Sequence, residues 1–192
     1  SACIRISTIS SKEAASVEYK IKIAGFGGQG ILFMGKVIAG AGLADEKEVS
    51  WLPSYGPEMR GGTANCSVCI SDEPIGSPLV VKPNVFLAMN RPSFEKFIDS
   101  VEPDGIVIVD SSLIDEKASR TDVRAFYIPA TELAEKNELS GLANMIMLGK
   151  LLKESAFCSK QAIAGAVESC VPKSKQHLIE YNLKAIGIGV SL

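Results

Sequence analysis

The chain has 192 residues and a formal net charge of −2. This length suffices for one domain with a substantial core. Because neither sign of charge dominates, nucleic acid and membrane surfaces are not expected as partners. The five cysteines are scattered without the spacing of a disulfide framework, which favours a reducing, cytoplasmic location.

The N-terminal residues 1–20 mix serine, lysine and glutamate with few apolar residues. They lack the apolar core of a signal peptide, so we expect a disordered lead-in or an expression-derived remnant. The domain is then expected to span residues 21–192. The longest apolar stretch, around Ile31–Ala44, is interrupted by glycines and a lysine, and it is too short to predict a membrane-spanning helix.

The first half of the chain predicts a strand, a glycine turn and a helix, followed by two further strands. Ile21–Ala24 is the expected first strand, and Ile31–Leu43 is apolar on most faces, as a packed helix would be. A short strand follows at Val49–Leu52. Residues 53–62 contain two prolines and three glycines, which predict an ordered, irregular loop before a strand at 63–70.

The second half alternates strands with helices and sets the expected fold class. Strands are expected at 85–89, 106–109 and 125–128, a helix near Pro92, and later helices at 142–152, at 163–170 behind Ser159 as N-cap, and from 174 onward. This alternation predicts a single α/β domain, doubly wound and Rossmann-like, with a mostly parallel sheet and helices on both faces. The late helices are expected to cover one side.

The glycine turn matches a dinucleotide-binding fingerprint at Gly25, Gly27 and Gly30. Such a turn lets the backbone approach a ligand, and the helix N-terminus favours a phosphate or carboxylate. A nicotinamide or flavin site also needs a carboxylate at the end of the second strand, but here the carboxylates lie at or before that strand's start, near Glu48. A purely structural strand-to-helix turn therefore stays open as an alternative.

Several sequence motifs closely resemble the gamma subunit of 2-oxoacid:acceptor (ferredoxin) oxidoreductases. The most specific is Trp51–Asn65, which reads WLPSYGPEMRGGTAN, combined with GFGGQG at Gly25–Gly30. Further similar segments occur in the same order at Asp72–Pro78, Ala88–Asn90 and Asn144–Gly149. The motif is most similar to that of 2-oxoglutarate enzymes, although pyruvate and branched-chain or aryl 2-oxoacid relatives share the fold.

The resemblance implies a role in the oxidative decarboxylation of a 2-oxoacid to an acyl-CoA, with reduction of ferredoxin. Thiamine diphosphate, Mg and iron–sulfur clusters are expected only in the partner subunits, named alpha, beta and a ferredoxin-like delta. The nearest sequence here to a thiamine diphosphate motif is Pro103-Asp104-Gly105, and four closely spaced thiolates for a cluster are lacking. The isolated chain is thus not expected to be active, and it has no predicted catalytic residue.

Coenzyme A is the ligand that this chain is expected to contact itself. The candidate binding residues are Gly25, Gly27, Gly28, Gln29, Gly30 and Asn90, with the phosphates on the backbone amides at 27–30. Asn90 and Asp110 each close a strand and have two open interpretations: a crevice residue, or a helix cap or turn former. The expected partner-facing residues are Tyr55, Gly56, Pro57, Glu58, Arg60, Gly61 and Gly62, because tyrosine and arginine are enriched at interface hot spots.

Two other signals favour structural roles. Cys66 and Cys69 form a C-x-x-C, but residues three apart in a strand point to opposite faces and cannot share a metal. His177 lies among lysines, which predicts a solvated face, and no metal site is expected. Two alternative functions remain: a stand-alone NAD(P)-binding oxidoreductase, and a structural subunit that binds no ligand.

Overall fold

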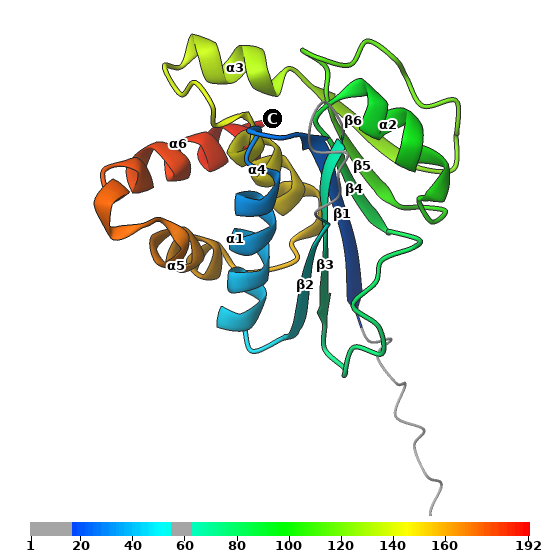
Figure 1. Cartoon of the computed structure of the whole chain (residues 1–192), viewed down its shortest axis with the longest axis horizontal. Coiled ribbons are helices and arrows are strands. Elements are labelled where there is room, and N and C mark those ends of the chain that lie inside the picture. The colour runs from blue at the N-terminus through cyan, green and yellow to red at the C-terminus, as the bar shows by residue number, and fades with distance from the viewer. Residues whose placement is uncertain (1–16, 55–62) are drawn as a thin grey trace, which may run out of the picture.

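The computed structural model describes residues 17–54 and 63–192, which form a six-stranded sheet covered by helices (Figure 1). The strands lie in the order β2-β3-β1-β4-β5-β6. Strands β1, β4, β5 and β6 pair in parallel, whereas β3 is antiparallel to both of its neighbours, β1 and β2. Only β3 among these six therefore runs against the rest. The strands span Glu18–Phe26 (β1), Glu48–Ser54 (β2), Thr63–Ser71 (β3), Val85–Ala88 (β4), Ile106–Asp110 (β5) and Arg124–Ile128 (β6).

The helices lie on both faces of the sheet, as the strand–helix alternation predicts. Figure 1 shows α1, α4, α5 and α6 on one face and α2 on the other. In the described part of the chain, no helix is long and apolar enough to cross a membrane. The helices span Ile31–Ala44 (α1), Arg91–Phe97 (α2), Ala130–Lys136 (α3), Ala143–Ser155 (α4), Lys160–Cys170 (α5) and Leu178–Ser191 (α6), with short 3₁₀ turns at Ile98–Ser100 (η2) and Lys173–Lys175 (η3).

The hydrophobic core consists of two clusters, one on each face of the sheet. On β1, Ile21 and Ile23 point into the larger cluster beneath α1, α4 and α5, whereas Ala24 points to the smaller cluster beneath α2. Strands β4 and β5 are buried at every position, which explains why they read as continuous apolar runs. The doubly wound α/β fold is therefore confirmed.

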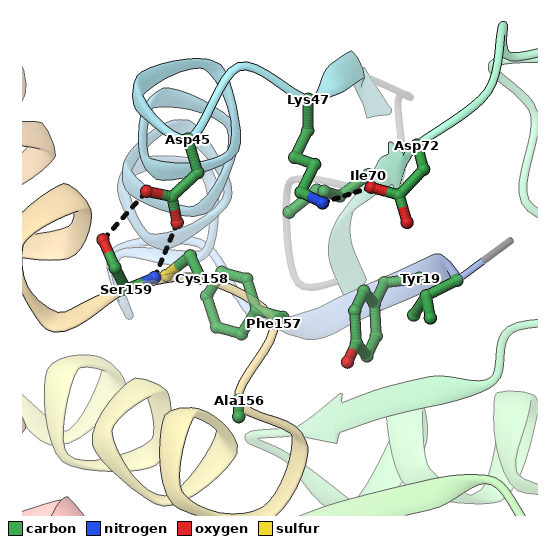
Figure 2. Close-up of a pocket in the computed structure, with 10 residues that line it drawn as sticks. Tyr19, Asp45, Lys47, Ile70, Asp72, Ala156, Phe157, Cys158 and Ser159 are labelled. Carbon is green, nitrogen blue, oxygen red and sulfur yellow. Dashed lines mark hydrogen bonds and ion pairs between the residues drawn. The ribbon is translucent and has the colours of Figure 1, made fainter. Parts of the chain in front are cut away.

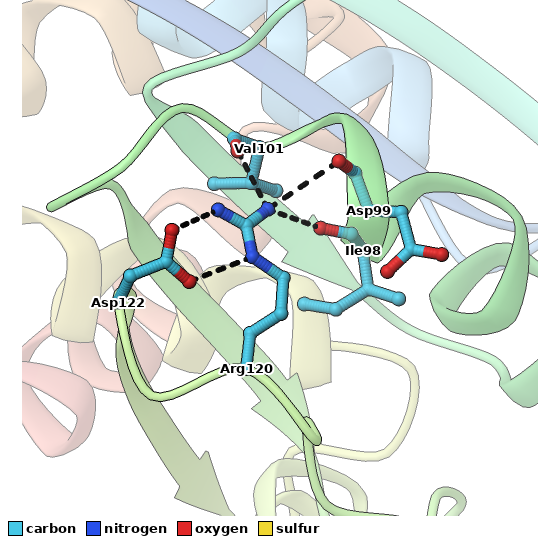
Figure 3. A network of polar contacts seen from close by, with 5 residues as sticks. All are labelled: Ile98, Asp99, Val101, Arg120 and Asp122. Carbon is cyan, nitrogen blue, oxygen red and sulfur yellow. Dashed lines mark hydrogen bonds and ion pairs between the residues drawn. The ribbon is translucent and has the colours of Figure 1, made fainter.

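An arginine fixes the long connection between β5 and β6 to the end of the α2 region (Figure 3). Arg120 Nη1 donates to the carbonyl oxygens of Ile98, Asp99 and Val101 at 3.1, 3.4 and 2.6 Å. Its Nε and Nη2 donate to the carboxylate of Asp122 at 2.8 and 2.6 Å, and this pairing lowers the pKa of Asp122. The contact satisfies carbonyls at a helix C-terminus, so its role is structural.

Two local expectations need correction. β1 begins at Glu18, so residues 18–20 belong to the domain rather than to the expected lead-in of residues 1–20. Helix α3, at Ala130–Lys136, was not expected at all, because its seven residues are too few to show a clear apolar period. The predicted cap of α5 is confirmed, since Ser159 Oγ accepts a hydrogen bond from Ala162 N at 3.0 Å.

Candidate functional site

The carboxyl edge of the sheet contains a topological switch point between the neighbouring parallel strands β1 and β4. The chain leaves β1 into α1 on one face and leaves β4 into α2 on the other (Figure 1). The two connections therefore diverge above the strand ends. In open α/β sheets, ligands bind at this position.

The glycines of the turn at residues 25–30 are required for different geometric reasons. A side chain at Gly25 would come within 2.6 Å of Gln29 Oε1 and 2.8 Å of Ile31 Cδ1, so this position is closely packed. Gly28 and Gly30 have φ angles of 90° and 74°, in the left-handed region that glycine adopts without strain. At Gly27, no atom of the described residues lies within 4 Å of the position of an added Cβ. The turn is therefore rigid at one end and open to solvent in the middle.

Gln29 ties the turn to the neighbouring strand. Its Oε1 accepts a hydrogen bond from Phe26 N at 2.6 Å, and its Nε2 donates to Met89 O at 2.9 Å. Met89 directly follows β4. Both halves of the switch point are therefore held in one arrangement by a single side chain.

The N-terminus of α1 is left without a side-chain cap. Gly30 occupies the N-cap position and supplies no side chain. The N–H groups of the first helical turn lack intrahelical partners and carry the positive end of the helix dipole. Asn144, at the start of α4, donates from Nδ2 to Gly30 O at 3.2 Å and so fixes the carbonyl side of the turn. This arrangement favours a bound anion.

Asn90 and Asp110 both hydrogen-bond backbone N–H groups near the ends of their strands. Asn90 Oδ1 accepts from Ser93 N at 2.9 Å as the N-cap of α2, and the side chain is buried. Asp110 accepts from the backbone N–H groups of Ser112 and Thr131 and from the Thr131 hydroxyl. These contacts are those of a helix cap at Asn90, and those of a turn former at Asp110 that also binds the first turn of α3.

The expected partner-facing residues lie outside the described residues: Tyr55, Gly56, Pro57, Glu58, Arg60, Gly61 and Gly62. The residues on either side of them are placed by the sheet. Thr63 is paired with Phe26 at the end of β1, and Ser54 is paired with Asn65 on β3. Both flanking residues therefore lie at the edge of the sheet that carries the glycine turn.

Three cavities surround the glycine turn, and we name each by its neighbouring element. The α3-side cavity has a volume of about 230 Å³, the α6-side cavity about 320 Å³ and the β3-side cavity about 270 Å³. Gly28 lines all three. The others in the lining include Gln29, Thr131 and Glu135 on the α3 side; Gly30, Phe33, Asn144, Lys175 and Asn182 on the α6 side; and Phe26, Ile31 and Ala64 on the β3 side.

A fourth cavity, of about 410 Å³, lies at the amino end of β1, away from the turn (Figure 2). Its polar side chains are already paired with one another or with the backbone. Asp45 accepts from the N–H and hydroxyl of Ser159 at 2.6 and 2.8 Å, Lys47 pairs with Asp72, and Tyr19 Oη donates to a backbone carbonyl. These contacts hold the end of α1 against the start of α5. We therefore assign this cavity a structural role.

The C-x-x-C and the histidine match their structural interpretations. Cys66 points into the α1 face of the sheet, and Cys69 lies beside Ser77 O on the other face. Burial raises the pKa of the Cys66 thiol to about 12, so it stays protonated and unreactive at neutral pH. His177 is exposed just before α6. Among the described residues, no group of three or more His, Cys, Asp or Glu side chains could hold a metal ion.

The sequence is similar to proteins of one kind. The profile of the family described as pyruvate ferredoxin/flavodoxin oxidoreductase matches residues 20–192. The ketoisovalerate oxidoreductase subunit VorA of Methanothermobacter thermautotrophicus is 40% identical over 90% of this chain, which spans only 36% of that relative's length. The 2-oxoglutarate synthase subunit KorC of Methanocaldococcus jannaschii is 37% identical over 93% of this chain and 96% of its own length.

Two solved structures share the fold. The gamma subunit of a keto/oxoacid ferredoxin oxidoreductase from Geobacter sulfurreducens has a TM-score of 0.77 and 30% identity, over 90% of this chain and 96% of its own. The 2-oxoglutarate:ferredoxin oxidoreductase from Magnetococcus marinus, solved with 2-oxoglutarate, coenzyme A and succinyl-CoA bound, has a TM-score of 0.80 and 26% identity. That match covers 91% of this chain and 30% of the other.

Proposed function

The chain belongs to the pyruvate ferredoxin/flavodoxin oxidoreductase family, and from this premise we propose that it is the gamma subunit of a 2-oxoacid:ferredoxin oxidoreductase. Its partners are then the alpha, beta and ferredoxin-like delta subunits, which supply thiamine diphosphate, Mg and the iron–sulfur clusters. Among the relatives, the 2-oxoglutarate subunit aligns over almost its whole length, which supports 2-oxoglutarate as the substrate. Ketoisovalerate is the alternative substrate, because the relative VorA, whose chain is much longer than this one, is a ketoisovalerate oxidoreductase subunit.

The second part of the proposal is that the glycine turn of this chain contacts coenzyme A. The observation that carries it is the N-terminus of α1, which has no side-chain cap and lies at the switch point beside two cavities that Gly28 and Gly30 line. A related enzyme was solved with coenzyme A and succinyl-CoA bound. The phosphates of the ligand then accept hydrogen bonds from the backbone N–H groups of Gly27, Gly28 and Gly30. Gln29, whose own N–H donates to Phe26 O at 3.3 Å, keeps the turn in place for them.

The experiment that tests this proposal is a Gly27→Val substitution in the assembled enzyme. Gly27 has an ordinary φ, and no atom of the described residues lies within 4 Å of the position that an added methyl group would take, so we expect the chain to accommodate a side chain there. The valine would occupy the space in which a phosphate lies. We expect the KM for coenzyme A to rise about tenfold or more, with an unchanged melting temperature.

Gly76→Val is the matched control. Gly76 lies in the connection between β3 and β4, also has an ordinary φ and also has no atom within 4 Å of an added methyl group. Its substitution is expected to leave the KM for coenzyme A unchanged. Gly28 is a poorer probe, because its φ of 90° strains any side chain. An unchanged KM in Gly27→Val would remove the ligand from the turn and favour a structural subunit.

A further inference from the structure

The α6-side cavity differs from the other two cavities at the glycine turn in its charge. Among the described residues that line it, Lys175 on η3 has the only charged side chain. In contrast, the α3-side cavity contains the carboxylate of Glu135, which repels phosphate, and the described lining of the β3-side cavity has no charged side chain. Within the described residues, Lys175 forms no ion pair with a carboxylate. Its charge is therefore available for an anionic ligand.

A buried asparagine in the same cavity has an unused acceptor. Asn182 on α6 is 3% exposed, and its Nδ2 donates to Leu178 O at 2.7 Å. Its Oδ1 has no hydrogen-bond partner in the described structure. A buried polar atom without a partner costs about 1–3 kcal/mol, and a donor from a water molecule or a ligand would remove this cost. A ligand with an amino group would supply this donor.

The remaining walls of the cavity suit a flat ring. Phe33, Val171, Pro172 and Leu178 form an apolar lining, and Gly28 and Gly30 connect the cavity to the amides of the turn. The volume of about 320 Å³ lies in the range of small-molecule sites. Among the described residues, apolar walls, an acceptor without a hydrogen-bond partner, a lysine without an ion pair and the glycine turn therefore lie together.

Resting on the proposed coenzyme A contact, we propose that the α6-side cavity holds the adenosine 3′-phosphate end of the ligand. Lys175 then pairs with the 3′-phosphate, and Asn182 Oδ1 accepts a hydrogen bond from the exocyclic amino group of adenine. The diphosphate lies on the glycine turn, and the pantetheine arm leads away from α6. This assignment gives the cavity a specificity role that distinguishes coenzyme A from its dephosphorylated precursor.

The first test compares Lys175→Gln with Lys173→Gln in the assembled enzyme, using coenzyme A and dephospho-coenzyme A as substrates. Both lysines are exposed on η3, but only Lys175 lines the cavity. We expect Lys175→Gln to raise the KM for coenzyme A about tenfold and to leave that for dephospho-coenzyme A unchanged. Lys173→Gln should change neither value.

The second test concerns the adenine. Adenosine 3′,5′-bisphosphate and inosine 3′,5′-bisphosphate serve as competitors of coenzyme A in the wild-type enzyme, and we expect the adenosine compound to bind about tenfold more tightly because inosine lacks the amino group. Asn182→Leu should abolish this preference. The comparison of the two competitors on the wild-type enzyme stands even if the leucine variant folds poorly.

The outcomes separate this inference from the proposed function. If Gly27→Val raises the KM for coenzyme A but Lys175→Gln affects both substrates equally or neither, the turn binds the ligand and the α6-side assignment is wrong. Equal binding of the two bisphosphates would likewise overturn the role of Asn182. If Gly27→Val has no effect, the proposed contact itself fails.

Discussion

At the scale of single residues, burial decides which polar groups can act. Cys66 and Lys22 lie on the same sheet but on opposite faces, and neither is positioned for chemistry. Lys22 donates to Ser67 Oγ at 3.0 Å, and burial lowers its pKa. Burial raises the pKa of the Cys66 thiol to about 12. In both cases burial disfavours the charged form of the side chain, so the ionisation of each group makes the free energy of unfolding depend on pH.

The first prediction at this scale concerns Cys66 above pH 9. The unfolded chain loses the thiol proton near pH 9, whereas the folded chain keeps it until about pH 12. The folded state therefore binds more protons in this window, and the free energy of unfolding falls as pH rises, by about 1.4 kcal/mol per unit for this thiol. We expect urea denaturation of Cys66→Ala to show a shallower decline between pH 9 and 10.5 than the wild type.

Measurements between pH 7 and 8 provide the control, because the Cys66 thiol is protonated in both states there. The two proteins should then differ by a constant amount that reflects the lost side-chain volume. Lys22 contributes with the opposite sign, since a lowered folded pKa makes stability rise with pH up to the ordinary value of 10.5. Burial, the largest cause of the Lys22 shift, is present in both proteins, whereas the smaller effect of the Cys66 charge on Lys22 is lost in the variant. Parallel curves above pH 9 would contradict the prediction.

At the scale of elements, the contact between α4 and α6 is set by glycines. A side chain at Gly149 would overlap the carbonyl oxygen of Ile186, and one at Gly189 would overlap that of Ile146. The Cα atoms of the two glycines face each other across the crossing. This close approach places α6, and with it Asn182, against the start of α4 beside the glycine turn.

The prediction for this contact compares two glycine-to-alanine changes. Gly149→Ala forces the two helix backbones apart, and we expect it to lower the free energy of unfolding by about 1–3 kcal/mol. Gly187 lies on α6 with no atom within 4 Å of an added methyl group. Because alanine is the better helix former, Gly187→Ala should instead raise stability by about 0.5–1 kcal/mol. Thermal or urea unfolding measures both, and similar effects at the two positions would contradict the close crossing.

At the scale of the whole molecule, the carboxyl edge of the sheet combines the glycine turn with the ends of the segment at residues 55–62. The pairing of Phe26 with Thr63 and of Ser54 with Asn65 brings these parts together. Some relatives carry the matching region inside a much longer chain, since this chain spans 36% of one of them. A surface that docks onto further domains is consistent with both observations.

The prediction at this scale concerns Arg60, one of the expected partner-facing residues. Arginine is a residue type enriched at interface hot spots, and a residue that acts at an interface contributes to assembly rather than to folding. We expect Arg60→Ala to weaken co-purification with the partner subunits while changing the stability of the chain by no more than about 0.5 kcal/mol. Arg124→Ala, at the amino end of β6, is the control that should assemble normally. A large drop in melting temperature for Arg60→Ala would mark the segment as structural.

The sequence by itself determined the fold class, the glycine turn and the family. Local chemistry explains this success, because apolar runs such as Ile106–Val109 indicate buried parallel strands and Ser159 indicates a cap whatever surrounds them. The motif at Trp51–Asn65 carried the family resemblance, which the match over residues 20–192 confirms. These features depend on neighbours in the chain.

Only the tertiary structure decided the strand order and the composition of the cavities. The antiparallel β3 lies between β1 and β2, so the end of β2 is two strand spacings, or about 10 Å, from β1. A carboxylate at the end of β2 would therefore lie far from the glycine turn. The lack of such a carboxylate in the sequence says nothing about whether the turn binds a ligand other than a nicotinamide or flavin dinucleotide. Lys175 and Asn182 line the same cavity as Gly30, although more than 140 residues separate them from it in the sequence. Tertiary packing brings them together, and no local sequence pattern predicts it.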